Sequence, residues 1–342
     1  MILFFLIFTV VLSDLSIEYN DDKQRLEING NGKIDEDFSL IVLNYLKERN
    51  NLIELNKIKE IQINQNEKQF EWKSVSFFQQ FDSLETVSIN INQLPNYLFV
   101  HSSIKSITFG KDVETIGNYC FYDCEYLENI SFEKNCQLTT INNYAFKDCI
   151  RLTTIVLPKS IENIDFRKVF DGCVSLESIE IENGGKYSSD GNTIYSKNST
   201  VVEYYYSQNK IMNKYQFHEE SEIIEEKAFV GESIEMIEMS NKLITIKQKA
   251  FYGNKNIESI IIPSNVTSIQ SYAFAFNDGL ENVIIQSENI KLGEKCFYAR
   301  ASLHGILCCV VWNIRESPKN RNYTFIVSET ITKSDNNFNN II

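Results

Sequence analysis

Residues 251–274 read FYGNKNIESIIIPSNVTSIQSYAF. Apolar side chains follow Phe251 at offsets of six, nine and eleven residues, and the last two of these lie two positions apart. Such alternation is the period of a short β-strand that buries one of its faces. A second apolar pair, Val266 and Ile269, precedes the next phenylalanine, Phe274. A unit of this length cannot cover both apolar edges by itself, so it has to stack on similar units.

The same unit recurs along most of the chain. Its phenylalanine anchors are Phe78, Phe99, Phe121, Phe146, Phe170, Phe229, Phe251, Phe274 and Phe297. Successive anchors are 21, 22, 25, 24, 59, 22, 23 and 23 residues apart, and the coils after Phe99 and Phe229 run one residue short. A small residue precedes several of the anchors, as Ala145, Ala228, Ala250 and Ala273 do. The period predicts an α/β repeat solenoid with one parallel sheet and short helical turns at the anchors.

The pattern resembles the BspA-like (Treponema-type) leucine-rich repeat family, whose repeat reads roughly C-x-x-L-x-x-I-x-L-P-x-x-V-x-x-I-x-x-x-A-F. Residues 149–158 (CIRLTTIVLP) and 260–274 (IIIPSNVTSIQSYAF) carry the match. The resemblance covers about residues 78–310 and departs where Val169, instead of alanine, precedes Phe170. It implies a non-enzymatic protein, secreted or on the surface of a host-associated bacterium or protozoan, that takes part in attachment and recognition.

The chain is expected to have a leader, a cap, a solenoid and a tail. Residues 2–12 are apolar apart from Thr9, and this run is shorter than the ~20 residues that span a bilayer as a helix. It is typical of a secretory signal peptide, although it lacks the usual basic start, and an uncleaved N-terminal anchor is the alternative. The expected segments are a signal peptide at 1–13, an N-terminal cap at 14–77 with a helix at 38–46, the leucine-rich-repeat solenoid at 78–310 with a β-hairpin insert at about 184–212, and a C-terminal tail or cap at 311–342.

Charge and sequons limit the choice of partner. The formal net charge of −13 repels phosphate backbones, so we expect no nucleic-acid partner. No segment after the signal peptide is long and apolar enough to be a transmembrane span. In a secreted or cell-surface protein, Asn-X-Ser/Thr sequons are possible glycosylation sites. They are Asn129, Asn198, Asn265 and Asn322, of which Asn198 and Asn265 lie in turn-like contexts.

Most of the eight cysteines follow the phase of the repeat. Cys124, Cys149 and Cys173 each lie three residues after an anchor, where later coils have Asn254 and Asn277. This position is therefore expected to need a small side chain that hydrogen-bonds the turn, and the thiols are expected to be buried and mostly reduced. A disulfide framework is the alternative. We expect no metal and no cofactor, because the chain has only three histidines and no C-x-x-C pair.

No constellation of residues predicts catalysis. His101, His218 and His304 have no nucleophile or acid at motif spacing, and no zinc-protease, P-loop or dinucleotide motif occurs. The main alternative is a parallel β-helix carbohydrate-active enzyme, whose coils are similarly long and whose outward strand positions would carry basic and acidic residues. Here those positions are rich in hydroxyl groups, partly apolar, and free of Lys, Arg and His. A purely structural surface-coat spacer is a third alternative.

The outward strand positions are the predicted binding face. Apolar side chains there have no reason to face water, and exposed apolar groups rimmed by polar ones often mark contact sites. The predicted binding residues are Val156, Met236, Ile261 and Ile284, with Asn129, Ser131, Ser259 and Asn282 beside them. A second candidate is an aromatic patch on the hairpin insert, formed by Tyr204, Tyr205 and Tyr206. The predicted partner is an extracellular protein or glycan, and the oligomeric state is left open.

Overall fold

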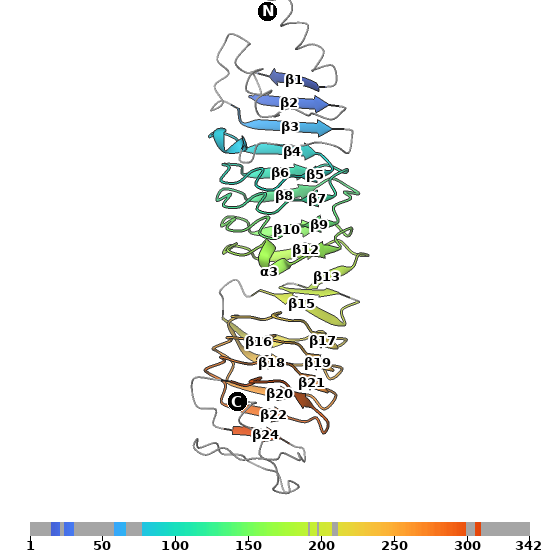
Figure 1. The fold of residues 1–342 in the computed structure, drawn as a ribbon, viewed down its shortest axis with the longest axis vertical. Coiled ribbons are helices and arrows are strands. Elements are labelled where there is room, and N and C mark those ends of the chain that lie inside the picture. Colours follow the sequence, from blue (N-terminus) through green and yellow to red (C-terminus); the bar gives the residue numbers. More distant parts are fainter. Residues whose placement is uncertain are drawn as a thin grey trace, which may run out of the picture. The chain divides into compact units, whose positions relative to one another are not determined.

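The computed structural model describes residues 15–20, 24–30, 58–65, 77–190, 192–196, 198–206, 211–298 and 305–308. The chain divides into two compact units, Met1–Lys186 (unit 1) and Tyr187–Ile342 (unit 2), and each is described by itself. Within each unit, short strands from successive coils lie parallel and stack in order (Figure 1). This confirms the predicted parallel-strand solenoid. The predicted signal peptide, the helix at 38–46 and the tail at 311–342 lie outside the described residues.

Unit 1 has a main sheet and a narrow second sheet. The main sheet has the order β1 (Leu15–Asn20), β2 (Arg25–Gly30), β3 (Glu60–Gln65), β4 (Thr86–Asn90), β6 (Ser106–Phe109) and β8 (Asn129–Phe132). Next along the chain, β10 (Thr154–Leu157) pairs with β12 (Ser178–Ile181). The narrow sheet contains β5 (Gln93–Leu94), β7 (Thr115–Ile116), β9 (Thr140–Ile141) and β11 (Asn163–Ile164). Strand β1 is antiparallel to β2, whereas β2, β3 and β4 pair in parallel, so the described parts of the predicted cap extend the main sheet.

Unit 2 has the same two-sheet arrangement. Its main sheet has the order β16 (Met212–Gln216), β18 (Ile234–Glu238), β20 (Ser259–Ile262), β22 (Asn282–Ile285) and β24 (Gly305–Cys308). Its second sheet has the order β13 (Tyr187–Asp190), β14 (Thr193–Ser196), β15 (Val201–Tyr205), β17 (Ile223–Ile224), β19 (Thr245–Ile246), β21 (Ser268–Ile269) and β23 (Lys291–Leu292). The two apolar edges of each repeat therefore become two parallel sheets that enclose one core.

A column of aromatic anchors forms the centre of each core. In unit 1 the stacked rings are Phe78, Phe99, Phe121, Phe146 and Phe170, with centroids 4.5, 5.0, 5.1 and 5.9 Å apart. In unit 2 they are Tyr205, Phe229, Phe251, Phe274 and Phe297, with centroids 4.9, 4.9, 4.9 and 5.3 Å apart. All of these rings are buried. Each such pair contributes ~0.5–1.5 kcal/mol beyond the burial of its area, so the regular spacing of anchors in the sequence stabilises the whole stack.

The turns that close the coils are not helical, so the α/β description was wrong. Among the described residues, the only helices are the four-residue α3 (Phe166–Val169) and the 3-10 turn η2 (Phe77–Gln80). In most coils the residues two before and two after the anchor have a left-handed backbone, as Tyr144 (φ 62°) and Asp148 (φ 60°) do around Phe146. A left-handed residue interrupts a right-handed helix, so the chain rounds each anchor in separate tight turns.

The predicted hairpin insert forms a modified coil of unit 2. Strands β13, β14 and β15 are antiparallel to one another, and β15 then pairs in parallel with β17. The ring of Tyr205 stacks on Phe229, and its backbone N–H donates to the carbonyl oxygen of Ala228 at 2.9 Å. The backbone N–H of Phe229 makes the equivalent bond to Ala250 at 2.7 Å. Tyr205 is therefore an anchor that a search for phenylalanine alone misses.

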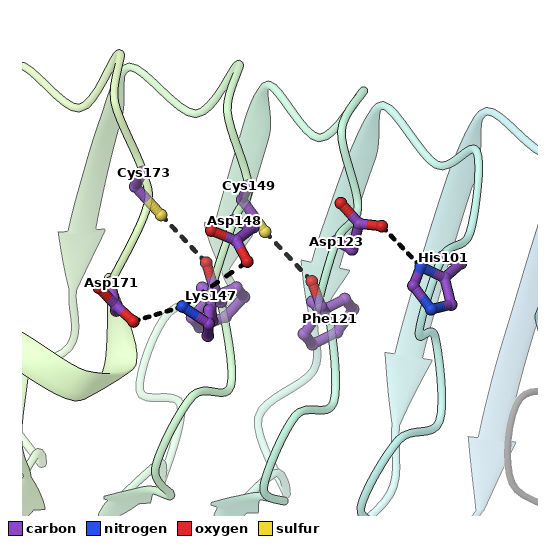
Figure 2. Close-up of polar contacts among 9 residues, drawn as sticks. His101, Phe121, Asp123, Lys147, Asp148, Cys149, Asp171 and Cys173 are labelled. Atoms are coloured by element: carbon purple, nitrogen blue, oxygen red, sulfur yellow. Dashed lines mark hydrogen bonds and ion pairs between the residues drawn. The ribbon is translucent and has the colours of Figure 1, made fainter.

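Thiols three residues after the anchors join neighbouring coils of unit 1. The Sγ atoms of Cys124, Cys149 and Cys173 donate to the carbonyl oxygens of Phe99, Phe121 and Phe146 at 3.0, 3.2 and 3.0 Å, respectively, as Figure 2 shows for the last two thiols. In unit 2, Nδ2 of Asn254 makes the same bond to Phe229 at 2.7 Å. The position therefore uses a small side chain that donates to the preceding turn. Cys124 and Cys149 are buried, Cys173 is partly exposed, and all three are free thiols.

Candidate functional site

The predicted apolar residues of the binding face point away from the core. Val156, Met236 and Ile261 are 50%, 51% and 49% exposed, and Ile284 is half-buried. Val156, Ile261 and Ile284 each lie between two buried strand neighbours, because successive side chains of a strand point to opposite faces, whereas Met236 lies between the exposed Glu235 and the buried Ile237. Ile260 and Ile262, for example, are buried on either side of Ile261. The sheet therefore presents these apolar groups to solvent without exposing the core.

In unit 2 the structure brings five predicted residues together. Met236 lies in register with Ser259, Ser259 with Asn282, and Ile261 with Ile284. Side chains that are directly opposite on adjacent strands have Cβ atoms roughly 5 Å apart. The patch that we call the unit 2 face consists of Met236, Ser259, Ile261, Asn282 and Ile284. It combines an apolar row with hydroxyl and amide groups that can bond a partner.

The other three predicted residues lie in unit 1. Asn129 and Ser131 are exposed on β8, and the Ser131 hydroxyl is 2.9 Å from that of Thr108 on the next strand. Val156 lies on β10, opposite Glu180 on β12. Strands β8 and β10 belong to different sheets. The structure therefore does not join Asn129 and Ser131 to Val156 by strand pairing, and the outer surface of β6 and β8 is mainly hydroxyl and amide.

Strands β18 and β20 open a groove beside the unit 2 face. They share one bridge, Met236 with Ser259, whereas β20 and β22 pair along four positions. Strand β20 ends at Ile262 and is followed by Pro263, which has no backbone N–H to donate to the preceding coil. The groove has a volume of about 660 Å³ and is lined by Gln216, Phe217, Glu219, Ile237, Glu238, Met239, Ser240, Asn241, Lys242, Ile261, Pro263 and Gln286.

This groove was not predicted from the sequence, although two features of the sequence accompany it. The coil after Phe229 is one residue short, and the next coil has Pro263 at the end of its strand. Phe217 and Ile237 are buried, and Met239 packs against the core beside them. Ile261 rises at the rim with about half of its side chain exposed. The groove thus continues the apolar row of the unit 2 face toward the ends of the strands.

The tyrosine patch predicted on the insert does not form as an exposed surface. Tyr205 is fully buried as an anchor, and Tyr206 is 6% exposed. Only Tyr204 is partly exposed, and it stacks on Tyr206 with ring centroids 5.7 Å apart. Because two of the three rings pack inside unit 2, a partner could meet only the outer side of Tyr204.

The described sequons differ in their surroundings. Asn129 is exposed on the outer side of β8, in the middle of the hydroxyl-rich surface. Asn198 is exposed in a turn with a left-handed backbone, φ 56°. Asn265 is exposed in the turn after β20, and its Nδ2 donates to the carbonyl of Asn241 at 2.7 Å. Asn322 lies outside the described residues. A glycan on Asn129 would project from the unit 1 sheet, whereas Asn198 and Asn265 lie in turns.

A second depression lies in unit 1 and is polar. Its volume is about 800 Å³, and it is lined by Glu114, Lys134, Asn135, Cys136, Gln137, Thr139, Lys159, Ser160, Glu162, Glu182 and Asn183. Several of these groups already bond the protein itself. The Ser160 hydroxyl donates to the carbonyls of Cys136 and Leu138, and the backbone N–H of Lys159 donates to Glu182. Several side chains that line this depression therefore hold neighbouring coils together.

Two tyrosines with a raised pKa are packed within the core of unit 2. Burial raises the pKa of Tyr195 to about 12 and holds that of Tyr215 well above its ordinary value. Their hydroxyls lie 3.4 Å apart, and that of Tyr215 is 2.8 Å from the Thr193 hydroxyl. Phenols in this state keep their protons near neutral pH, so they serve as hydrogen-bond groups and not as bases.

The described part of the chain contains no group of three or more His, Cys, Asp or Glu side chains placed to hold a metal ion. It also contains no helix that combines the length and the apolar character needed to cross a membrane.

Comparison with known proteins identifies the family. The BspA type leucine-rich repeat region matches in six copies, over residues 49–177, 92–217 and 188–304. The pneumococcal vaccine antigen PcpA has a similar structure, with a TM-score of 0.52 and 21% identity over 82% of this chain and 76% of that one. A leucine-rich repeat protein from Eubacterium ventriosum gives a TM-score of 0.49 and 20% identity over 87% of this chain and 77% of that one.

A leucine-rich cell surface protein from Faecalibacterium prausnitzii gives a TM-score of 0.47 and 17% identity, over 86% of this chain and 93% of that one. At 21% identity, the likeness to the PcpA structure shows the fold alone. No curated protein sequence matches this chain. The family regions cover well over half of the sequence, from residue 49 to residue 304. The chain therefore belongs to the BspA-type leucine-rich repeat family.

Proposed function

We propose that this protein is a non-enzymatic recognition protein, secreted or held at the cell surface, that binds an extracellular protein through the unit 2 face. The observation that carries the proposal is the outward-facing group of Met236 and Ile261, each about half exposed, and the half-buried Ile284 that lies in register with Ile261. An array that needed only to be soluble would gain from polar residues at these positions. Exposed apolar side chains rimmed by polar groups often mark contact sites.

The groove beside Ile261 supports a protein partner over a small ligand. Binding energy in protein interfaces is concentrated in a few apolar or aromatic anchors that fill pockets on the other side. The groove supplies such a pocket, with Phe217, Ile237 and Met239 in its apolar lining and Ser240, Asn241 and Gln286 around them. The membership of the repeat family and the apolar run at residues 2–12 support an extracellular location.

The test begins with a binding screen of the full chain. Purified extracellular-matrix and serum proteins, together with a glycan array, are immobilised, and bound protein is measured by biolayer interferometry or fluorescence. We expect at least one protein to bind specifically. The double variant Met236→Asp/Ile261→Asp should weaken that binding at least tenfold, because two charges would enter the contact and two apolar groups would be lost.

A matched control separates this effect from a general loss of exposed apolar surface. Val174 and Ile244 are 57% and 41% exposed and lie outside the main-sheet face. The variant Val174→Asp/Ile244→Asp should bind as the wild type does. Binding that survives Met236→Asp/Ile261→Asp but is lost in Tyr204→Ala would place the contact on the insert instead. A chain that binds no member of either panel would favour the spacer alternative.

A further inference from the structure

The inference concerns the chemistry of the partner and rests on the proposed function. Three exposed glutamates, Glu235, Glu258 and Glu281, border the unit 2 face where its strands begin. Each glutamate is the residue just before Met236, Ser259 or Asn282. Because Met236 is in register with Ser259 and Ser259 with Asn282, the three glutamates form one row across adjacent strands. The backbone N–H of Glu281 donates to the carbonyl oxygen of Glu258 at 2.8 Å, so the neighbouring residues are one strand spacing apart.

Nothing in the described part of unit 2 neutralises this glutamate row. The ion pairs found there leave out all three carboxylates. Like charges on neighbouring strands destabilise a sheet, so the arrangement has a cost that the fold itself does not require. The unit 2 face therefore has an apolar centre and, along one edge, a row of negative charge that has no ion-pair partner among the described residues.

In unit 1, the residues at the equivalent edge of the main sheet form ion pairs. The equivalent positions are occupied by Glu85, Lys105 and Glu128. The backbone N–H of Lys105 donates to the carbonyl oxygen of Glu85, and the backbone N–H of Glu128 donates to that of Lys105, as Glu281 does to Glu258 in unit 2. Glu85 pairs with Lys105 at 3.1 Å, and Glu128 pairs with Arg151 at 3.4 Å. The repeat architecture thus accommodates alternating charges at this edge, and unit 2 alone has three glutamates in a row.

Two lysines beside the unit 2 face and its groove are already paired. Lys214, which lies in register with Met236, pairs with Glu238 at 2.6 Å, and Lys242 in the groove pairs with Glu220 at 2.6 Å. These exposed pairs contribute little net field, and Glu219 adds a further carboxylate to the groove. The charge that a partner would meet next to Met236 and Ile261 comes mainly from the glutamate row, and it adds to the net charge of −13 of the whole chain.

We propose that the unit 2 face binds a cationic protein segment in which lysine or arginine side chains lie directly beside apolar ones. The apolar side chains would pack on Met236, Ile261 and Ile284 and enter the groove. The cations would meet Glu235, Glu258 and Glu281 and relieve the repulsion among them. Sulfated or otherwise acidic glycans and acidic proteins meet the same row with like charge, so they are disfavoured as partners.

The test uses defined peptides and the full chain. Three immobilised synthetic peptides serve as probes: one alternating lysine and leucine, one alternating lysine and serine, and one alternating glutamate and leucine. We expect the lysine–leucine peptide to bind about tenfold more tightly than either of the others, because only it satisfies both the row and the apolar centre. Raising NaCl from 50 to 500 mM should weaken this binding about tenfold, since exposed charges are screened.

Charge-matched variants test whether the row itself is responsible. The variant Glu235→Gln/Glu258→Gln/Glu281→Gln should lose at least tenfold in affinity for the lysine–leucine peptide. The control Glu226→Gln/Glu288→Gln/Glu294→Gln removes the same charge from exposed positions of unit 2 outside its main sheet, and it should stay within twofold of wild type. Thermal melts should show that the first variant is at least as stable as wild type, because it removes a like-charge row.

Three results would overturn the inference. Equal losses in both glutamine variants would mean that only the net charge attracts the peptide. Equal binding of the lysine–serine peptide would mean that the apolar centre takes no part. A protein partner from the screen that is lost in Met236→Asp/Ile261→Asp but unaffected by the glutamine row variant would leave the proposed function standing and reject the cationic segment.

Discussion

The side chain three residues after an anchor determines how neighbouring closing turns are joined. In unit 1 a thiol donates to the preceding anchor's carbonyl, as Cys149 does to Phe121 at 3.2 Å, and in unit 2 an amide does so at Asn254 (Figure 2). A buried carbonyl without a donor costs ~1–3 kcal/mol, so these donors stabilise their coils, although the position also holds Phe81 after Phe78 and Glu232 after Phe229. Next to these thiols, the exposed pairs of His101 with Asp123 and of Lys147 with Asp171 lie on the outer side of the turns.

The thiols are expected to be unreactive in the native protein. Burial raises the pKa of Cys120, Cys124 and Cys149 far above the ordinary value and that of Cys296 to about 12, and the thiolate is the reactive form. In a Cys308→Ser/Cys309→Ser background, iodoacetamide at pH 8 should label fewer than one of the six remaining cysteines per native chain and all six in urea. Rapid native labelling of Cys124 and Cys149 would contradict the buried ladder.

The same shifts predict lower stability at alkaline pH. Thiols of the unfolded chain lose their protons near pH ~8.5, whereas the buried thiols of the folded chain keep theirs to a higher pH. Above the pKa of the unfolded thiols, the folded chain therefore binds more protons than the unfolded chain. The free energy of unfolding should therefore be unaffected below pH 8 and fall above pH 9, by up to ~1.4 kcal/mol per pH unit for each buried thiol. Urea titrations from pH 7 to pH 10 measure this, and Cys149→Ala should reduce the slope.

At the scale of elements, the insert contributes a complete coil. Strand β15 extends the second sheet of unit 2, Tyr205 stacks on Phe229, and β16 extends the main sheet. The Tyr205 hydroxyl reaches the sulfur of Met212 at 3.2 Å, so even its polar atom has a place in the core. The insert therefore closes the N-terminal side of this core, and only its β13–β14 part departs from the repeat.

Substitutions at two adjacent tyrosines should separate packing from surface roles. Tyr205→Ala should lower the free energy of unfolding by ~3–5 kcal/mol, because it removes one ring from the column, and Tyr205→Phe should cost less than ~1.5 kcal/mol. Tyr204→Ala should change stability by less than ~1 kcal/mol, since Tyr204 is partly exposed. Urea unfolding measures all three. Similar losses for Tyr204→Ala and Tyr205→Ala would reject Tyr205 as an anchor.

At the scale of the whole molecule, stability is expected to be distributed over coils. Each anchor contacts the anchors before and after it, as Phe121 does with Phe99 and Phe146. In a stack of this kind, stability is approximately a sum of local terms and nearest-neighbour terms. The chain divides into two compact units, so damage to one column should stay within its own unit.

Phe121→Ala tests this distribution. The substitution should cost ~3–5 kcal/mol locally and speed amide hydrogen exchange in β6 and β8 of unit 1. Exchange in β20 and β22 of unit 2 should remain at the wild-type rate. Phe251→Ala is the reciprocal variant and should reverse the pattern. Uniformly faster exchange in both units for either variant would show that the two units unfold as one.

The repeat, its phase and most of the outward-facing residues could be predicted from the amino-acid order alone. Anchors such as Phe146, core positions such as Ile155 and exposed positions such as Val156 follow from the alternation of apolar and polar side chains. That alternation is a local property, because it depends only on which side of a strand each side chain occupies. The donor position occupied by Cys149 could likewise be inferred from the asparagines at the same place in later coils.

How the coils join depends on contacts between residues that are far apart in the sequence. The left-handed residues beside each anchor, the use of Tyr205 as an anchor and the single bridge between β18 and β20 all depend on hydrogen bonds and contacts with other coils. A one-residue-short coil and Pro263 are visible in the sequence, but their effect appears only when the next strand must pair with them. For the same reason Glu235, Glu258 and Glu281 are unremarkable in sequence and form one charged row only once the strands stack in register.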